Sequence, residues 1–319
     1  MKIRIRILLT AVGVVSVILF IGFSSFIGLQ VFAGSTQLIT NDETKHSDGF
    51  WGNCGIDYES FHSLYMVEKI AIPSSYEDHT IPGDYIYAAQ SQRSKNHQTV
   101  ILVHGLGDNR YSNYPIAELF LKRGYNVVTY DQRSTNENTA RYTTFGFREK
   151  YDLVDWVNYV EQEAPEQKIG IWGASYGGAT AGLALAYDDM NERVDFLILD
   201  CPVSSMKWMV EQEMKSIDVG IPVGYMAWCG NIINKLKLGF SYQDADVAAA
   251  MKDMKTPVLI INSKTDAKTP YFMGKDIYNA ISENNRYMWT VDDSKHCEIW
   301  VDYNQEYRNK IDGFLKKYE

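Results

Sequence analysis

Residues 168–178 read KIGIWGASYGG, and this stretch decides the fold. Its apolar first half is typical of a buried strand, and residues 173–177 have the pattern G-x-S-x-G, centred on Ser175. The small side chains from Ala179 to Ala186 predict a closely packed helix directly afterwards. A strand, a sharp turn and a helix in this order predict a nucleophile elbow, which exposes the serine hydroxyl above a sheet. Glycine is expected two positions either side of the serine because so tight a turn leaves no room for a side chain.

Strands and helices alternate on both sides of this elbow. Besides the elbow strand, apolar and β-branched runs predict strands at 64–72, 84–88, 99–103, 126–130, 194–199, 257–261 and 287–291. Helical spacing of apolar residues predicts helices at 117–122, 148–163, 277–281 and 299–315. This alternation predicts an α/β fold with a mostly parallel central β-sheet and helices on both faces. Residues 64–202 and 256–319 are expected to form this core.

One segment interrupts the alternation. Residues 203–255 follow the sixth predicted strand and are rich in methionine and tryptophan, among them Met206, Met226 and Trp228. Several helical stretches within the segment predict a small helical cap inserted above the strand ends. Its apolar side chains either form the cap's own core or face the site, and the sequence leaves both interpretations open.

The N-terminus combines positive charge with a long apolar segment. Three basic residues between Lys2 and Arg6 precede an uncharged run over residues 7–33. As a helix this run would be about 40 Å long, enough to cross a hydrocarbon core of ~30 Å with tilt. Positive charge on this side alone places the N-terminus in the cytoplasm and the remainder outside. The first 33 residues are therefore either an uncut membrane anchor, which we favour, or a signal peptide cleaved after Ala33.

Residues 34–63 are polar and predict an extracytoplasmic spacer. The 319-residue chain carries a formal net charge of −9, or −12 once the three basic residues before the apolar run are removed. An acidic surface argues against nucleic acid as a partner. The four cysteines, Cys54, Cys201, Cys229 and Cys297, match neither a disulfide-dense small domain nor a zinc site, so most are expected to be buried thiols.

An elbow serine needs a base and an acid that orients the base. His296 is the only histidine after Ser175, and it lies in a polar loop between the last predicted strand and the last helix. Asp266 follows the strand at 257–261 and is the expected acid, whereas Asp200 is the alternative because it also ends a strand. The order serine, acid, histidine is the one that this architecture uses.

Two backbone N–H groups are expected to stabilise the oxyanion that forms during acyl transfer. The turn after the strand at 99–103 reads HGLG at residues 104–107, and its glycines allow the backbone to approach the serine closely. The N–H groups of Leu106 and Tyr176 are the predicted oxyanion pair. His104 is expected to make structural hydrogen bonds rather than to act as the base.

Together these segments resemble the α/β-hydrolase superfamily over residues 64–319. The resemblance lies in HGLGDNR at 104–110, DQR at 131–133, the elbow at 173–178, Asp266 with Thr269-Pro270, and His296. GFREKYDL at 146–153 and DCP at 200–202 are similar to segments of bacterial hydrolases that are often membrane-anchored and resemble serine aminopeptidases and esterases. Cys297 departs from the pattern, since many relatives have glycine after the histidine.

The resemblance implies a serine hydrolase that cleaves carboxylic esters of small or medium acyl substrates and needs no metal or cofactor. A serine peptidase or amidase is the alternative, because the ending SYGG is also similar to prolyl-oligopeptidase-type peptidases. A non-catalytic cell-surface module on a hydrolase scaffold is a further alternative, from another class of protein. The expected partners are a small-molecule ester or peptide substrate and the membrane that the N-terminal segment enters.

Overall fold

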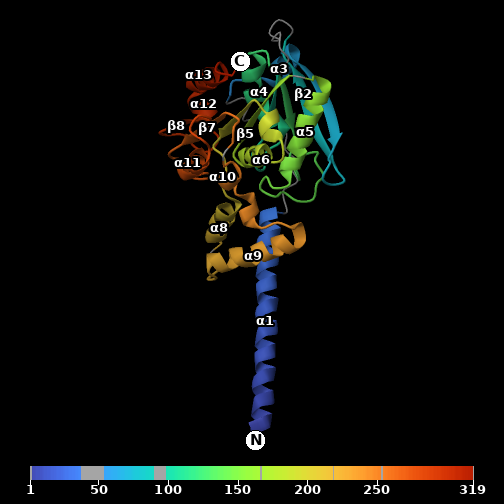
Figure 1. Ribbon diagram of the computed structural model, residues 1–319, viewed down its shortest axis with the longest axis vertical. Coiled ribbons are helices and arrows are strands. Elements are labelled where there is room, and N and C mark those ends of the chain that lie inside the picture. Colours follow the sequence, from blue (N-terminus) through green and yellow to red (C-terminus); the bar gives the residue numbers. More distant parts are fainter. Residues whose placement is uncertain are drawn as a thin grey trace. The chain divides into compact units, whose positions relative to one another are not determined.

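The computed structural model describes residues 2–36, 54–89, 98–165, 167–217, 219–252 and 254–318 (Figure 1). Most of the predicted spacer lies outside these ranges. The chain forms two compact units, which are described one at a time. The larger unit consists of Leu38–Ser205 and Ala245–Glu319, and the smaller one of Met1–Gln37 and Met206–Asp244.

An eight-stranded sheet forms the centre of the larger unit (Figure 1). The strands are β1 (Met66–Pro73), β2 (Thr80–Tyr87), β3 (Gln98–Val103), β4 (Asn126–Tyr130), β5 (Lys168–Ala174), β6 (Phe196–Asp200), β7 (Val258–Ser263) and β8 (Arg286–Val291). They lie in the order β1-β2-β4-β3-β5-β6-β7-β8. Only β2 runs antiparallel to its neighbours, and the remaining pairs are parallel. The predicted mostly parallel sheet is confirmed.

Helices cover both faces of this sheet. They are α3 (Tyr58–Leu64), α4 (Tyr114–Leu121), α5 (Glu149–Glu163), α6 (Tyr176–Leu185), α7 (Met190–Arg193), α10 (Val247–Ala250), α11 (Tyr271–Ala280), α12 (Ile299–Asp302) and α13 (Asn304–Leu315), with a 3₁₀ turn η1 (Arg110–Asn113). On one face, alternate strand residues such as Leu102, Trp172 and Ile198 share a buried cluster with Phe120 of α4 and Phe314 of α13. Period-two alternation therefore gives this layer its core.

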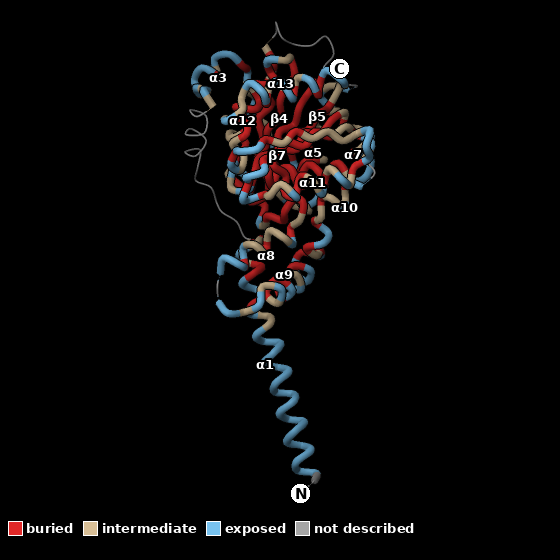
Figure 2. The backbone as a smooth tube through the Cα atoms, turned by 90° about the vertical axis from the view of Figure 1, so that its left-hand side faces the viewer, coloured by how far each residue is buried: buried red, intermediate tan, exposed pale blue. Residues whose placement is uncertain are grey.

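The opposite face packs against α5, α6 and α11. A Cβ on Gly83 of β2 would lie 2.5 Å from the ring of Trp156 in α5, so only glycine allows this approach. Gly274 likewise brings α11 against Ile260 of β7. Figure 2 shows the result, with buried strands at the centre of the unit. Strands enclosed on both faces explain why the sequence shows continuous apolar runs there.

The closing helix differs from the prediction. The sequence predicts one helix over 299–315, but the structure divides it into α12 and α13 at Tyr303, whose φ of −122° and ψ of 36° lie outside the helical region. The break lets Trp300 and Tyr307 pack edge to face, with ring centroids 5.2 Å apart. Packing of large aromatic side chains accompanies the interruption of the helical pattern here.

The smaller unit combines the N-terminal helix with the segment inserted after the sixth strand. Its helices are α1 (Lys2–Thr36), α8 (Met206–Ser216) and α9 (Val223–Leu238), followed by the 3₁₀ turn η2 (Tyr242–Ala245), which runs into the larger unit. The predicted helical insertion after β6 is confirmed. Residues 3–23 of α1 are exposed and strongly apolar, and α1 is long enough to cross a membrane (Figure 2).

Two glycines bring α1 and α9 into close contact. A Cβ on Gly28 would lie 2.6 Å from the carbonyl oxygen of Cys229, and a Cβ on Gly230 would collide with the side chain of Val31. Ser24 and Tyr225 add a hydrogen bond between their hydroxyl groups at 2.6 Å. The C-terminal part of α1 is therefore a packed element of this unit, as small-residue contacts between helices allow.

Candidate active site

Ser175 lies at the tip of a strained turn between β5 and α6. Its φ of 54° and ψ of −116° are values that residues other than glycine rarely adopt. A Cβ on Gly173 would lie 2.5 Å from the carbonyl oxygen of Gly177, and a Cβ on Gly177 would collide with the carbonyl oxygen of Val103. The turn can therefore close only because both positions are glycine, as the sequence predicts.

Backbone hydrogen bonds tie this turn to the loop after β6. The N–H group of Ser175 donates to the carbonyl oxygen of Asp200 at 2.8 Å. The carbonyl oxygen of Ser175 accepts from the N–H groups of Gly178 and Val203, both at 3.1 Å. The strained conformation is thus held from two sides, which gives the serine side chain a defined position.

His296 and Asp266 form a continuous chain of hydrogen bonds with Ser175. The Nε2 atom of His296 lies 2.8 Å from Oγ of Ser175, and its Nδ1 atom lies 2.8 Å from Oδ2 of Asp266. The three side chains come from the loops that follow β5, β7 and β8. Parallel strands bring these loops to one edge of the sheet, so residues far apart in the sequence meet there.

Asp266 is held by the turn that follows it. Its Oδ1 atom accepts hydrogen bonds from the N–H groups of Lys268 at 2.8 Å and Thr269 at 2.9 Å, and the Thr269 hydroxyl donates to Oδ2 at 2.8 Å. Burial disfavours the charged carboxylate, but the hydrogen bond and charge of His296 lower the pKa of Asp266 below its usual value. The sequence predicts no role for Thr269 in the site. Its position three residues after the acid is the feature that could have indicated its contact with Asp266.

The HGLG turn is fixed by Gln132. The N–H group of Gln132 donates to Nε2 of His104 at 2.9 Å, and its side-chain amide donates to the carbonyl oxygen of His104 at 2.5 Å. Burial lowers the pKa of His104, whose Nδ1 lies 2.7 Å from the carbonyl oxygen of Gly105. As expected, His104 makes structural hydrogen bonds and is separate from the Ser175 chain.

Leu106 and Tyr176, the predicted oxyanion pair, line the same small hollow beside this turn. The side chain of Tyr176 is buried, and its hydroxyl accepts hydrogen bonds from the N–H groups of Thr144 at 3.0 Å and Phe145 at 2.7 Å. Glu149, also buried, accepts from the N–H group of Thr144 at 2.8 Å. These contacts hold the side chain of Tyr176 in place and give Glu149, within the segment at 146–153, a structural role.

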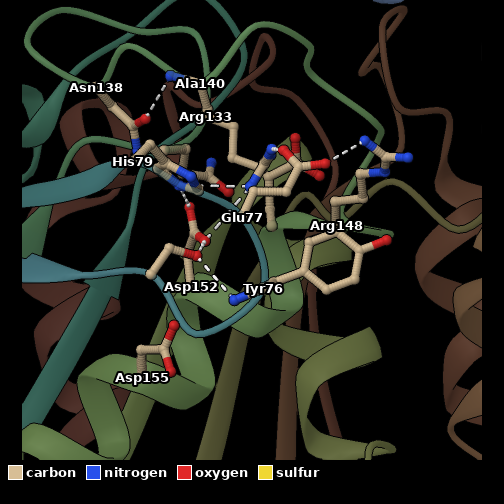
Figure 3. Close-up of polar contacts among 12 residues, drawn as sticks. Tyr76, Glu77, His79, Arg133, Asn138, Ala140, Arg148, Asp152 and Asp155 are labelled. Carbon is tan, nitrogen blue, oxygen red and sulfur yellow. Dashed lines mark hydrogen bonds and ion pairs between the residues drawn. The ribbon is translucent and has the colours of Figure 1, made fainter. Parts of the chain in front are cut away.

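A network of charged residues surrounds Arg133, the residue that follows Gln132 in the chain (Figure 3). Arg133 forms ion pairs with Glu77 and, at 3.5 Å, with Asp152. Asp152 also contacts His79 at 3.1 Å, and Arg148 pairs with Glu77. The carboxylates of Asp152 and Asp155 also accept hydrogen bonds from the Ser74 hydroxyl at 3.0 Å and the Ser75 N–H group at 2.8 Å, which join the loop between β1 and β2 to α5.

A cavity of about 250 Å³ opens beside Ser175, and its walls include Gly105, Ala174, Trp172, Trp300 and His296. It is a little smaller than the ~300–1,000 Å³ of typical small-molecule sites, so a short group fits it better than a long chain.

One group of described residues in the site could hold a metal ion. It consists of Cys201, His296 and Cys297, whose possible ligand atoms lie within 4.8 Å of one another. The two sulfur atoms are 3.2 Å apart, and all four cysteines are free thiols. A metal ion at this position would bind the imidazole of His296, which also contacts Ser175.

Comparison with known proteins identifies the architecture. A family model described as the alpha/beta hydrolase fold matches residues 98–226. The structure of the Pyrococcus furiosus esterase Pf2001 superposes with a TM-score of 0.62 at 19% identity, over 88% of this chain and 98% of that one. The chain has the α/β-hydrolase fold. The acylaminoacyl peptidase of Pyrococcus horikoshii shares it with a TM-score of 0.57 at 18% identity, over 82% of this chain and 44% of that one.

Curated proteins are also similar to this chain in sequence. The uncharacterized protein YqkD of Bacillus subtilis is 26% identical over 262 residues, which cover 81% of this chain and 83% of YqkD. The lysophosphatidylserine lipase ABHD12 of Danio rerio is 23% identical over 230 residues, or 65% of this chain and 55% of the lipase. Hydrolases of esters and of peptides therefore both stand among the proteins that this chain resembles.

Asp200, the alternative acid, is placed differently in the structure. It is 3% exposed, and its Oδ2 atom accepts a hydrogen bond from the hydroxyl group of Tyr307 at 2.8 Å. Burial raises the pKa of Asp200 to about 6, although Tyr307 and His296 oppose this effect. Asp292 and Asp293 are exposed and point to Lys264 and Thr265. Among these four acids, the structure places only Asp266 in hydrogen-bond contact with His296.

Proposed function

We propose that this protein is a serine hydrolase that works through an acyl-enzyme intermediate. The observation that carries the proposal is the hydrogen-bonded chain from Ser175 through His296 to Asp266 at a strained elbow. With the proton on Nδ1, the Nε2 atom of His296 can accept the hydroxyl proton as Oγ attacks the acyl carbon. His296 then returns this proton to the leaving group, and the same steps with water in place of serine release the acid.

Asp266 and the two backbone N–H groups have supporting roles in this mechanism. The carboxylate of Asp266 holds the imidazole in the required tautomer and stabilises the imidazolium that forms during each step. The N–H groups of Leu106 and Tyr176 stabilise the oxyanion, and one such donor contributes roughly 3 kcal/mol to the transition state. The close support of both segments by Gln132 and Glu149 is consistent with this preorganised role.

Carboxylic esters with small or medium acyl groups are the proposed substrates. The esterase and the lipase among the similar proteins support ester cleavage, and the modest cavity favours short groups. The peptidase neighbour supports the second candidate, an amidase or peptidase that uses the same residues. A non-catalytic module is disfavoured because a scaffold without activity has no need for a strained serine within 2.8 Å of a base.

A fluorophosphonate probe tests the proposed nucleophile directly. The probe phosphonylates only activated serines, with loss of fluoride, so wild-type protein in isolated membranes should be labelled and the Ser175→Ala variant should not. Ser63→Ala is the matched control because Ser63 is exposed on α3 and bonds only to the carbonyl oxygen of Ser60 among the described contacts. Equal labelling of wild-type and Ser175→Ala protein would refute the proposal.

The acid limb of the pH profile reports on His296. Burial lowers its pKa, but the hydrogen bonds with Asp266 and Cys201 outweigh burial and raise the pKa above the ordinary value. Protonated imidazole cannot accept the serine proton, so kcat/KM should increase with pH and its inflection should lie above ~6.5. Asp266→Asn removes a charge that favours imidazolium, so the inflection should move to lower pH. An identical inflection in both proteins, measured with a neutral ester, would contradict the contact.

We also propose that α1 is an uncut single-pass anchor and that the catalytic unit is extracytoplasmic. Lys2, Arg4 and Arg6 place the N-terminus in the cytoplasm. Cleavage after Ala33 would remove buried residues such as Ile27 and Val31 together with the contacts that they make in the smaller unit. This loss of packing favours retention of the helix over its use as a cleaved signal.

Protease treatment of intact cells tests this topology. Protease added to the outside of intact cells should digest the larger unit. In untreated cells, the protein should remain in the membrane fraction after the membranes are washed at high pH. A cytoplasmic protein in the same cells, which must survive the treatment, is the control for cell integrity. Degradation of the hydrolase unit only after lysis would show that it lies inside the cell.

A further inference from the structure

The cavity beside Ser175 has an acidic lining. Three carboxyl groups, those of Asp108, Asp200 and Glu298, contribute to its walls. The described residues that line it include no lysine or arginine. The only basic group there is His296, which is already paired with Asp266. The lining therefore attracts a cation and repels an anion.

Asp200 gives this cavity an unsatisfied acceptor. Its Oδ2 atom accepts a hydrogen bond from Tyr307, whereas its buried Oδ1 atom has no nitrogen or hydroxyl donor among the described residues, and the thiol of Cys201 is only a weak donor to this carboxyl group. A buried carboxylate oxygen is normally paired, so a donor from a bound molecule would complete this group. Burial raises the pKa of Asp200 to about 6, and the nearby charge of His296 opposes this effect.

Asp108 places a second carboxylate next to the nucleophile. A Cβ on Gly105 would lie 3.3 Å from Oδ2 of Asp108 and 3.7 Å from Cβ of Ser175, so Gly105 separates the two side chains by little more than its own width. Glu298 stands two residues after His296 and is half-buried. Asp108 therefore lies close to Ser175, and Asp200 and Glu298 belong to the wall of the same cavity.

The aromatic walls also favour a cation. Trp172 and Trp300 line the cavity, and the ring of Trp300 already contacts a cation, because the guanidinium group of Arg308 lies 4.5 Å from its centroid. Trp172 is therefore the aromatic residue of the wall that is left for a ligand. Indole faces attract ammonium groups through their quadrupole. A metal ion is a poorer occupant, because Asp108, Asp200 and Glu298 do not form a group of close ligand atoms among the described residues. An organic ammonium ion carries both the charge and the hydrogen-bond donors that the cavity lacks.

We propose that the cavity binds a protonated amine on the substrate, a few bonds from the acyl carbon that Ser175 attacks. The substrates are then short esters or amides that carry an ammonium group, and their uncharged isosteres are poorer substrates. This inference rests on the proposed serine-hydrolase function. It deepens that function by naming the feature that the site selects.

A pair of isosteric esters tests the inference on the full-length protein in detergent. The p-nitrophenyl ester of 3-aminopropanoic acid ends in an ammonium group, and that of butanoic acid has a methyl group at the same position. After each rate is divided by the rate of hydroxide hydrolysis, we expect kcat/KM to favour the amino ester by about tenfold or more. A ratio at or below one would overturn the inference and leave the proposed hydrolase activity intact.

Substitutions in the lining assign the selectivity to its carboxylates. Asp108→Asn, Asp200→Asn and Glu298→Gln should each lower the ratio between the two esters. Asp292→Asn is the matched control, because Asp292 lies in the His296 loop but is 83% exposed in its side chain and paired with Lys264. Thermal unfolding of each variant shows whether it is folded, and Asp108 is exposed, so its variant is expected to fold. Unchanged ratios in all three lining variants would overturn the assignment.

A binding measurement separates this inference from the catalytic proposal. In the Ser175→Ala variant, isothermal titration with n-butylammonium chloride should show saturable binding that Asp200→Asn weakens, whereas 1-butanol should bind more weakly. If the amine binds but the Ser175→Ala substitution does not reduce hydrolysis, the cation site is supported and the assignment of Ser175 as the nucleophile is refuted. Equal binding of amine and alcohol would refute the cation site alone.

Discussion

Replacing Ser175 or His296 with alanine should lower kcat for ester hydrolysis by roughly 10⁴-fold or more. The two side chains are 2.8 Å apart and act in the same step, because the serine is a weak nucleophile until the imidazole accepts its proton. The effects should therefore not add, and the double variant should be little worse than either single variant. Purified full-length variants and a p-nitrophenyl ester provide the measurement.

The control for this experiment is Ser63→Ala, which should hydrolyse the ester like the wild type because Ser63 is exposed and remote in sequence from the elbow. Any trace of wild-type enzyme sets the lowest rate that can be measured, so the fluorophosphonate probe should be used to count active sites. A Ser175→Ala variant that retains near wild-type turnover would end the proposal that this serine is the nucleophile.

The Asp266→Asn substitution should lower kcat by roughly 10⁴-fold while it leaves the fold intact. The carboxylate accepts a hydrogen bond from the Nδ1 atom of His296 at 2.8 Å. An amide can present its NH₂ group there instead, which favours the tautomer of His296 with its proton on Nε2. The side chain keeps its size, and its hydrogen bonds with the turn at Lys268 and Thr269 can persist in part. Circular dichroism and thermal unfolding should therefore resemble those of the wild type.

Asp292→Asn is the matched control for this substitution. It removes the same charge from the neighbourhood of His296, but its carboxylate is exposed and paired with Lys264 across the loops. Screened surface pairs contribute little, so its activity should stay close to that of the wild type. Equal losses in the two variants would show that the net charge of the loops matters and that Asp266 has no special contact with the histidine.

The strength of the sequence prediction differs between parts of the site. The elbow could be located because its glycines, its serine and the following small residues must occur in one short stretch. His296 could be selected because no other histidine follows the elbow. The sequence favours Asp266 over Asp200 as the acid but leaves Asp200 as an alternative, since each follows or ends a strand. Only the position of the Asp266 turn, held by Thr269, shows which carboxylate reaches the imidazole.

Contacts between segments far apart in the chain could not be predicted from the sequence. The helical insertion after β6 was predicted, but its packing against α1 joins segments that no local pattern relates. Nothing in the composition shows that Gly28 and Gly230 oppose each other, because a helix glycine by itself has many explanations. The unsatisfied oxygen of Asp200 is likewise a property of three-dimensional surroundings. The insertion's role as a cap stays a prediction.

The contact between α1 and α9 also sets an order of events during biosynthesis. The hydroxyl groups of Ser24 and Tyr225 are bonded although they are 201 positions apart in the chain. At about 5–20 residues per second, α1 waits roughly 10–40 s after its own synthesis before α9 is made. All of β1 to β6 must be synthesised during this interval. The groove around Gly28 therefore stays vacant in the nascent protein, and a ribosome that stalls before residue 230 leaves an anchor helix without its partner.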